Sequence, residues 1–332
     1  MSLIKKIERD DTYDASAVSA WMNHFQEQGY VILKSVISRE AVDSAKRGCT
    51  ELLDDLASRL LSEGKVDSLF QDASFEDRIS VLCASCKDKM PNLFRHELHK
   101  EEFFELLCGQ ALLDIVQRLL PTAERFRIYP NYSCRPKTKS KLHAVTWHQD
   151  AGLRADGGPS TAPEEERLDA FGKGRVVNCW TPLVEATREN GAMKFIRASH
   201  KKLLPHAVIG SYRGSTGSGA QLPETPGSDH AAIAATPQSV PAGTYMTGIE
   251  NLDPKDKAAA IDVECSPGDV VLFSNLLVHR GGINRTEKTR WSFDWRFQDA
   301  SKPTHRAESG HVVFENGKRA IDASNWASLE LS

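Results

Sequence analysis

Apolar residues recur at helical spacing along the first third of the chain. Residues 15–28 show the pattern most clearly, with Val18, Trp21, Met22 and Phe25 on one face and Gly29 as a stop signal. Ser38 has the residue type and position of a helix N-cap. The pattern predicts helices over residues 15–28, 38–61, 74–86 and 109–120, with a short strand at residues 30–33.

From residue 126 onward the pattern changes to short strands. They are predicted at residues 126–133, 142–147, 175–183, 192–196, 262–264, 269–278 and 289–298. Two polar segments rich in glycine and proline, residues 151–174 and 211–242, interrupt them, and loops of this length are usually lids, binding loops or disordered segments. We therefore expect one α+β domain over residues 1–332, helical over 1–125, with an antiparallel β core over 126–300.

Composition narrows the class of protein. The chain has 332 residues, of which 40% are hydrophobic and 26% charged, as in soluble globular proteins. A formal net charge of −3 gives no reason to expect a nucleic acid or an anionic membrane as partner. Seven scattered cysteines and a start without a signal-peptide core predict free thiols in a reducing compartment. We expect a cytoplasmic protein, with monomer and homodimer both open.

The stretch Trp147-His148-Gln149-Asp150 carries candidate metal chemistry. In a strand, side chains two apart share a face, so His148 and Asp150 would offer an imidazole and a carboxylate to one ion. About one such tripeptide is expected by chance in a chain of this length, so the match needs support. His279, at the end of the predicted strand 269–278, is the candidate third ligand. Two histidines and one carboxylate leave three positions open on octahedral iron, as in non-haem Fe(II) oxygenases.

The last predicted strand offers a candidate anion anchor. Aromatic residues at 291, 293, 295 and 297 alternate with polar residues at 290, 292, 294, 296 and 298. In a barrel with a polar mouth the polar face points inward and the aromatic face packs on the helices. Arg290 would then be placed for two parallel hydrogen bonds to a carboxylate, a geometry that a lysine cannot match.

Together these features resemble the phytanoyl-CoA dioxygenase family of Fe(II)/2-oxoglutarate oxygenases. The resemblance runs from about residue 21 to residue 297, and its motifs occur in order at residues 27–33, 147–150, 178–183 with 189–193, 198–201 and 267–290. It implies a double-stranded β-helix (a jelly-roll, cupin-like core) with the N-terminal helices packed on one sheet.

The resemblance also implies roles for individual residues. Iron would be bound by His148, Asp150 and His279, and the far carboxylate of 2-oxoglutarate by Arg290, with Trp180 packed beside the cosubstrate. The chain departs from the family at Gly281, where some members have a serine that helps to hold this carboxylate. Either this bond is absent or another side chain replaces the serine, and the candidates are Thr289, Asn284 and Ser292. The long inserts at 151–174 and 211–242 are a second departure, and they argue against an acyl-CoA substrate.

The implied function is that of a dioxygenase using Fe(II), 2-oxoglutarate and O2. It would oxidise a small molecule, with hydroxylation as the leading outcome, and decarboxylate 2-oxoglutarate to succinate and CO2. Asp150 disfavours halogenation, because related halogenating enzymes lack this carboxylate. Desaturation, ring formation and isomerisation at the same iron stay open. A non-catalytic, cupin-like binding protein is the alternative from another class, and the complete set of three ligands plus Arg290 argues against it.

Overall fold

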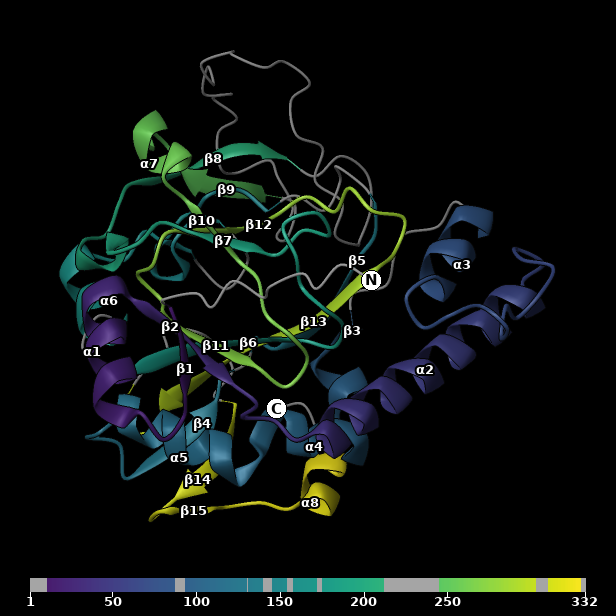
Figure 1. Ribbon diagram of the computed structural model, residues 1–332, viewed down its shortest axis with the longest axis horizontal. Coiled ribbons are helices and arrows are strands. Elements are labelled where there is room, and N and C mark those ends of the chain that lie inside the picture. The colour runs from purple at the N-terminus through teal and green to yellow at the C-terminus, as the bar shows by residue number, and fades with distance from the viewer. Residues whose placement is uncertain are drawn as a thin grey trace, which may run out of the picture.

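A computed structural model describes residues 11–86, 93–129, 131–139, 145–153, 158–171, 175–211, 245–302 and 310–329. A large central sheet separates a helical layer from a second, smaller β layer (Figure 1). The early helices and a short C-terminal helix lie on one side of the large sheet, and the small sheets lie on the other. This arrangement confirms the predicted α+β class with helices against one sheet.

The predicted helices form close to their expected bounds. They are α1 (Val18–Gln28), α2 (Arg39–Ser62), α3 (Arg78–Cys86) and α5 (Gln110–Leu119). A further helix, α4 (Glu101–Cys108), forms between α3 and α5. Gly29 ends α1 in the left-handed conformation at φ 85°, which a residue with a Cβ rarely adopts. The Ser38 side chain accepts a hydrogen bond from the Ala41 amide at 3.2 Å and so caps α2. Helix α3 begins four residues later than predicted.

The large sheet has ten strands. Its order is β1 (Thr12–Asp14), β2 (Tyr30–Lys34), β11 (Val270–Ser274), β6 (Val176–Pro182), β13 (Arg290–Asp299), β4 (Arg125–Ile128), β14 (His311–Glu315) and β15 (Lys318–Arg319), and β5 (Ser133–Lys137) pairs with both β13 and β3 (Leu93–Phe94). The long strand β13 pairs with β6, β4 and β5, so it runs through the middle of the sheet.

The second layer consists of two small sheets. One has the order β10 (Ile261–Val263), β7 (Met193–Phe195) and β12 (His279–Gly281), and the other is the hairpin of β8 (His206–Ser211) and β9 (Tyr245–Ile249). His148 forms an antiparallel bridge with His279 and so extends the first small sheet by one position.

Two apolar cores follow from this layering. The aromatic face of β13 (Trp291, Phe293, Trp295, Phe297) is fully buried against the helices, which confirms the predicted alternation. A second core lies between the sheets, with Trp180 and Phe273 from the large sheet and Phe195 from the small one. The polar face of β13 therefore points into the space between the sheets.

Several segments differ from the prediction. The predicted strand 126–133 is divided between β4 and β5, and the predicted strand 269–278 ends at Ser274, so that His279 begins the separate strand β12 of the small sheet. The insert at 151–174 contains the helix α6 (Glu164–Phe171), whose acidic residues 164–166 lie at the helix N-terminus, where the helix dipole favours negative charge. The chain beyond residue 300, for which no element was predicted, forms β14, β15 and α8 (Ala323–Ala327). Residues 145–147 of the predicted strand 142–147 are not in a strand, and residues 140–144 lie outside the described part of the chain.

The second insert falls almost wholly outside the described residues, which stop at 211 and resume at 245. Its two ends are the paired strands β8 and β9. No helix in the described ranges is both long and apolar enough to cross a bilayer.

Candidate metal centre

Three predicted side chains, His148, Asp150 and His279, meet between the sheets and are here called the triad. All three are buried, and one ligand atom from each lies within 4.8 Å of the others. The Asp150 Oδ1 atom is 3.4 Å from His148 Nε2 and 3.9 Å from His279 Nε2. The three atoms converge on one point, so the triad can hold a metal ion.

The two histidines are brought together by backbone pairing. The His148 amide donates to the His279 carbonyl at 3.0 Å, and the His279 amide donates back at 2.9 Å. Residues paired in this way carry their side chains on the same face, and the two imidazole rings lie 4.2 Å apart. This contact joins positions that are far apart in the sequence.

Asp150 reaches the site by a turn instead of a strand. It begins the 3-10 turn η3 (Asp150–Gly152), and the Ala151 amide bonds the Asn275 carbonyl at 3.1 Å. We expected His148 and Asp150 to share one face of a strand. This expectation is wrong for the backbone, because Asp150 lies in a turn. The two side chains still lie side by side, because the turn folds the carboxylate back toward His148.

Both imidazoles are held with Nε2 facing the centre. His148 Nδ1 lies 2.9 Å from the Thr146 carbonyl, and His279 Nδ1 lies 2.9 Å from the Leu277 carbonyl. A carbonyl only accepts, so each Nδ1 carries the proton and each Nε2 keeps its lone pair. Burial, together with His148, lowers the pKa of His279 to about 3, which keeps the ring neutral. Two lone pairs and a carboxylate oxygen facing one another repel unless a cation lies between them.

The other oxygen of Asp150 is tied to the large sheet. Its Oδ2 accepts from Arg296 Nε at 2.9 Å, from Arg296 Nη2 at 2.6 Å and from Asn178 Nδ2 at 3.0 Å. Arg296 and Asn178 are directly paired on β13 and β6. Burial alone would raise the pKa of Asp150, but the positive charge of Arg296 holds that pKa well below its usual range. The carboxylate therefore stays ionised, with Oδ1 directed at the triad centre.

Gln149 lies between His148 and Asp150 and anchors the segment that carries these two side chains. It is fully buried, and its side chain donates to the carbonyls of Lys202 and Leu276 and accepts from the Leu204 amide. Its own amide donates to His206 Nε2 at 2.9 Å, and burial lowers the pKa of His206 to about 4, so that ring is neutral. Gln149, Asn178, Arg296 and His206 were not among the site residues predicted from the sequence.

Arg290 lies on the same inward face of β13 as Arg296. It is 3% exposed, its Nη1 donates to Ser292 Oγ, and its Nε has no hydrogen-bond partner among the described residues. Its guanidinium carbon lies 5.3 Å from the centre of the Trp180 ring. An unsatisfied buried donor is costly, and burial lowers the pKa of this arginine to about 10. A buried guanidinium with a spare donor fits a carboxylate-bearing cosubstrate.

Thr289 and Asn284 both have partners within the chain. Thr289 Oγ1 lies 2.7 Å from Ser80 Oγ on α3, on the helical side of the large sheet. Asn284 Nδ2 donates to the carbonyls of Lys137 and Lys288 at 2.7 Å each, and its Oδ1 accepts from Thr286. The cosubstrate contacts expected for these two residues stay predictions. The present contact of Thr289 joins the start of β13 to α3, and those of Asn284 stabilise the turn before β13.

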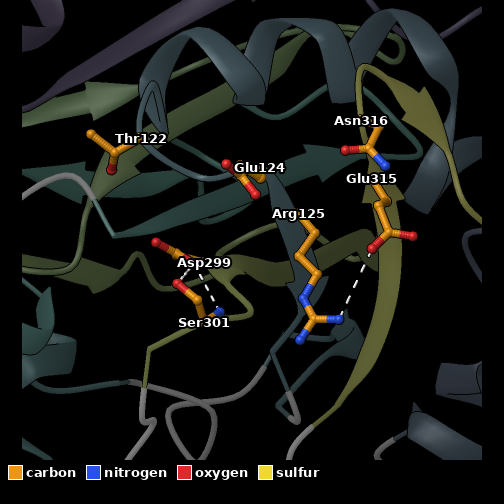
Figure 2. A pocket seen from close by; sticks show the side chains of 7 residues that line it. All are labelled: Thr122, Glu124, Arg125, Asp299, Ser301, Glu315 and Asn316. Atoms are coloured by element: carbon orange, nitrogen blue, oxygen red, sulfur yellow. Dashed lines mark hydrogen bonds and ion pairs between the residues drawn. The ribbon is translucent and has the colours of Figure 1, made fainter.

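A separate pocket of about 460 Å³ lies at the other end of β13 (Figure 2). Its polar lining consists of Thr122, Glu124, Arg125, Asp299, Ser301, Glu315 and Asn316. Asp299 ends the ten-residue strand that Arg290 begins, so roughly 30 Å of strand separate the two. The pocket contains no histidine and no triad residue, so it is not the candidate centre.

A double-stranded β-helix with two histidines and one carboxylate between its sheets defines the class of Fe(II)/2-oxoglutarate-dependent oxygenases. Comparison with known proteins gives the family. The phytanoyl-CoA dioxygenase (PhyH) family profile matches residues 25–292, and the chain belongs to this family. Iron and 2-oxoglutarate are the cofactors of such enzymes, and the triad and the buried Arg290 fit them.

Individual relatives are distant. A "Probable phytanoyl-CoA dioxygenase" from Caenorhabditis elegans is 22% identical over 289 residues, which span 85% of this chain and 75% of the relative. The structure resembles the non-haem monooxygenase ThoJ with a TM-score of 0.50 at 18% identity, covering 92% of each chain. It also resembles EvdO2 from Micromonospora carbonacea var. aurantiaca, complexed with 2-oxoglutarate, with a TM-score of 0.50 at 18% identity over 86% of this chain and 91% of that one. These two likenesses concern the fold.

Proposed function

We propose that this protein is a dioxygenase that hydroxylates a small molecule and decarboxylates 2-oxoglutarate to succinate and CO2. Iron is bound by His148, Asp150 and His279, and Arg290 binds the far carboxylate of 2-oxoglutarate. The observation that carries the proposal is the convergence of two Nε2 lone pairs and Asp150 Oδ1 in a buried site.

The chain's own residues hold and orient the reacting groups. Bound iron with 2-oxoglutarate supplies the oxidation of an unactivated C–H bond by O2. The Nδ1 bonds of the histidines fix the ring orientation, and Arg296 and Asn178 fix the carboxylate. Trp180 lies against the Arg290 guanidinium and restricts its position. Preorganised groups of this kind need little rearrangement when the cofactors bind.

The long inserts support a small-molecule substrate other than an acyl-CoA. The second insert follows β8. The first residue of β8, His206, accepts a hydrogen bond from the amide of Gln149, which lies between His148 and Asp150. The first insert begins directly after Asp150. The first insert therefore starts next to the proposed iron site, where a substrate must be recognised, and the second follows a strand whose first residue contacts that site.

An anaerobic titration tests the metal assignment. Addition of Fe(II) and then 2-oxoglutarate should give the weak visible charge-transfer band of the chelate. The His279→Ala variant should give no band, whereas His311→Ala, which changes a histidine of β14, two strands away from β13 in the large sheet, should keep it. No band in the wild type, or a full band in His279→Ala, contradicts the proposal.

Product analysis separates turnover from binding. Aerobic incubation with candidate small molecules should release succinate together with an oxidised product, and mass spectrometry distinguishes hydroxylation from desaturation, ring formation or isomerisation. A binding protein would show the charge-transfer band with no succinate for any compound of the panel.

A further inference from the structure

We propose that Lys137 binds the far carboxylate of 2-oxoglutarate together with Arg290, in the space that Gly281 leaves open. This inference rests on the proposed function and adds a cosubstrate-binding residue to it. The residues predicted for this position from the sequence have only hydroxyl or amide side chains.

Strand register places Lys137 beside Arg290. The two residues are directly paired across β5 and β13, and paired residues in an antiparallel sheet have side chains on the same face, about 5 Å apart at Cβ. Arg290 shares the inward face of β13 with Arg296, which bonds Asp150. Lys137 therefore also points into the space between the sheets.

The ammonium group of Lys137 lies against the strand that carries His279. A Cβ built on Gly281 would be 2.8 Å from Lys137 Nζ, and Nζ donates to the Gly282 carbonyl at 2.6 Å. Gly281 is two residues after His279 on β12, so its missing side chain would share the face of the triad histidine. The lysine fills the position that a side chain at residue 281 would occupy.

The charges of this region lack a counterion. Lys137 is 6% exposed and Arg290 is 3% exposed, and neither forms an ion pair with any residue that the structure describes. Burial and the positive charge of Arg290 lower the pKa of Lys137 well below its usual range. Two buried cations side by side are unfavourable unless an anion lies between them, and a dicarboxylate cosubstrate supplies that anion.

A purely structural role does not account for these features. The Gly282 carbonyl accepts one hydrogen bond from Lys137, but an ammonium has three donors. A neutral side chain could bind that carbonyl without placing a second cation next to Arg290. Of the three side chains predicted for the position, Thr289 is engaged with Ser80 and Asn284 with backbone carbonyls, while Ser292 Oγ accepts a hydrogen bond from Arg290 itself and has no charge to offset that of the cosubstrate.

The test compares two ligands that differ at the far carboxylate. Anaerobic charge-transfer titrations of the Fe(II) protein give dissociation constants for 2-oxoglutarate and for 2-oxopentanoate, which has the same chelating end and no far carboxylate. Lys137→Met should weaken 2-oxoglutarate binding at least about tenfold and change 2-oxopentanoate binding less than about threefold. Lys137→Gln, which keeps a donor for Gly282 but has no charge, should behave in the same way.

Lys139→Met is the matched control. Lys139 lies two residues further along, is exposed and pairs with Glu287, so its removal should leave both dissociation constants unchanged. Variants of Lys137 that bind 2-oxoglutarate within about threefold of the wild type overturn the inference. An equal loss for both ligands also overturns it, because that result indicates a structural role.

A crystal structure of the wild type with Fe(II) and 2-oxoglutarate decides the question even if the variants do not fold. Lys137 Nζ within about 3.2 Å of the far carboxylate supports the inference, and a carboxylate bound by Arg290 without Lys137 overturns it. Failure of the proposed function is a different result. In that case the wild type gives no charge-transfer band and Arg290→Met has no effect on 2-oxoglutarate binding.

Discussion

At the scale of single residues, the two carboxylate oxygens of Asp150 have different partners. Oδ1 faces the histidines, and Oδ2 accepts three hydrogen bonds from Arg296 and Asn178. A carboxylate held in this way cannot rotate, and its charge is stabilised by a buried guanidinium. Loss of an outer partner of a metal ligand typically weakens metal binding about 10- to 100-fold.

Arg296→Met should weaken Fe(II) binding about 10- to 100-fold, because Asp150 loses two of the three hydrogen bonds that orient it. Anaerobic Fe(II) titration measures the effect. Arg135→Met is a suitable control, since Arg135 pairs with Asp294 in the same sheet and has no contact with Asp150. Unchanged Fe(II) affinity in a folded Arg296→Met protein would show that Asp150 needs no such support.

Gly281→Ala should weaken 2-oxoglutarate binding about three- to tenfold and leave Fe(II) affinity unchanged. The added methyl group would lie 2.8 Å from Lys137 Nζ and must displace the ammonium. The same titration in a Lys137→Met background provides the control, because without the ammonium the glycine substitution should have little further effect. Equal losses in both backgrounds would indicate that Gly281 acts independently of Lys137.

Residue identities in the triad were predictable, but their supporting partners were not. His148, Asp150, His279 and Arg290 were identified from motif and family resemblance. Arg296 contacts Asp150 from 146 residues away, and Lys137 contacts Gly282 from 145 residues away. No local pattern encodes such pairs, because strand register brings them together.

At the scale of elements, the ends of α1 and α2 and the alternation of side chains in β13 could be predicted from the local sequence. Ser38 caps α2, Gly29 ends α1, and β13 alternates between an aromatic and a polar face. The α6 helix was missed because its eight residues are mostly polar and show little apolar periodicity. The turn η3 at Asp150 was also missed, since its backbone bonds to Asn275 form only in the folded chain.

Ser38→Ala should reduce the free energy of unfolding by about 1 kcal/mol, because the Ala41 amide loses its acceptor. Urea denaturation followed by circular dichroism measures the change. Ser62→Ala at the other end of α2 is the control. Its hydroxyl donates to the Arg59 carbonyl on an exposed surface, and its removal should have an effect within about 0.5 kcal/mol. Equal effects at both ends would contradict a capping role for Ser38.

At the scale of the whole molecule, both ends of the described chain form hydrogen bonds with segments that are distant in the sequence. Asp11, next to β1, is 8% exposed and accepts hydrogen bonds from Tyr30 on β2 and from Arg197 beyond β7. At the other end of the chain, the fully buried Trp326 of α8 donates to the Leu98 carbonyl at 2.8 Å. Both ends of the described chain are thus joined to the body of the protein.

The stability of the metal-free protein should depend on Asp11 in a pH-dependent way. Burial raises the pKa of Asp11, but hydrogen bonds from Arg197 and Tyr30 more than offset it, so the folded-state pKa lies below the ordinary 3.8. The unfolded chain then binds a proton at higher pH than the folded one. The stabilisation is present above pH 3.8 and is lost as the pH falls through the lower folded-state value.

Urea unfolding as a function of pH checks this prediction. The difference in unfolding free energy between the wild type and Asp11→Asn should be constant above about pH 5 and shrink below pH 3.8. Arg197→Met should remove most of the same pH dependence, because it removes the main stabilising partner of the carboxylate. A difference that does not change with pH would show that Asp11 titrates alike in both states.

The sequence by itself determined the helices α1, α2, α3 and α5, the alternating strand and the identities of His148, Asp150, His279 and Arg290, because these depend on local periodicity and on motif spacing. Tertiary structure alone decided how Asp150 is held and which side chain fills the space at Gly281. Both depend on strand register, which places Arg296 beside Asn178 and Lys137 beside Arg290. Register is set by how two cores pack against both faces of one sheet, and that information is spread over the whole chain.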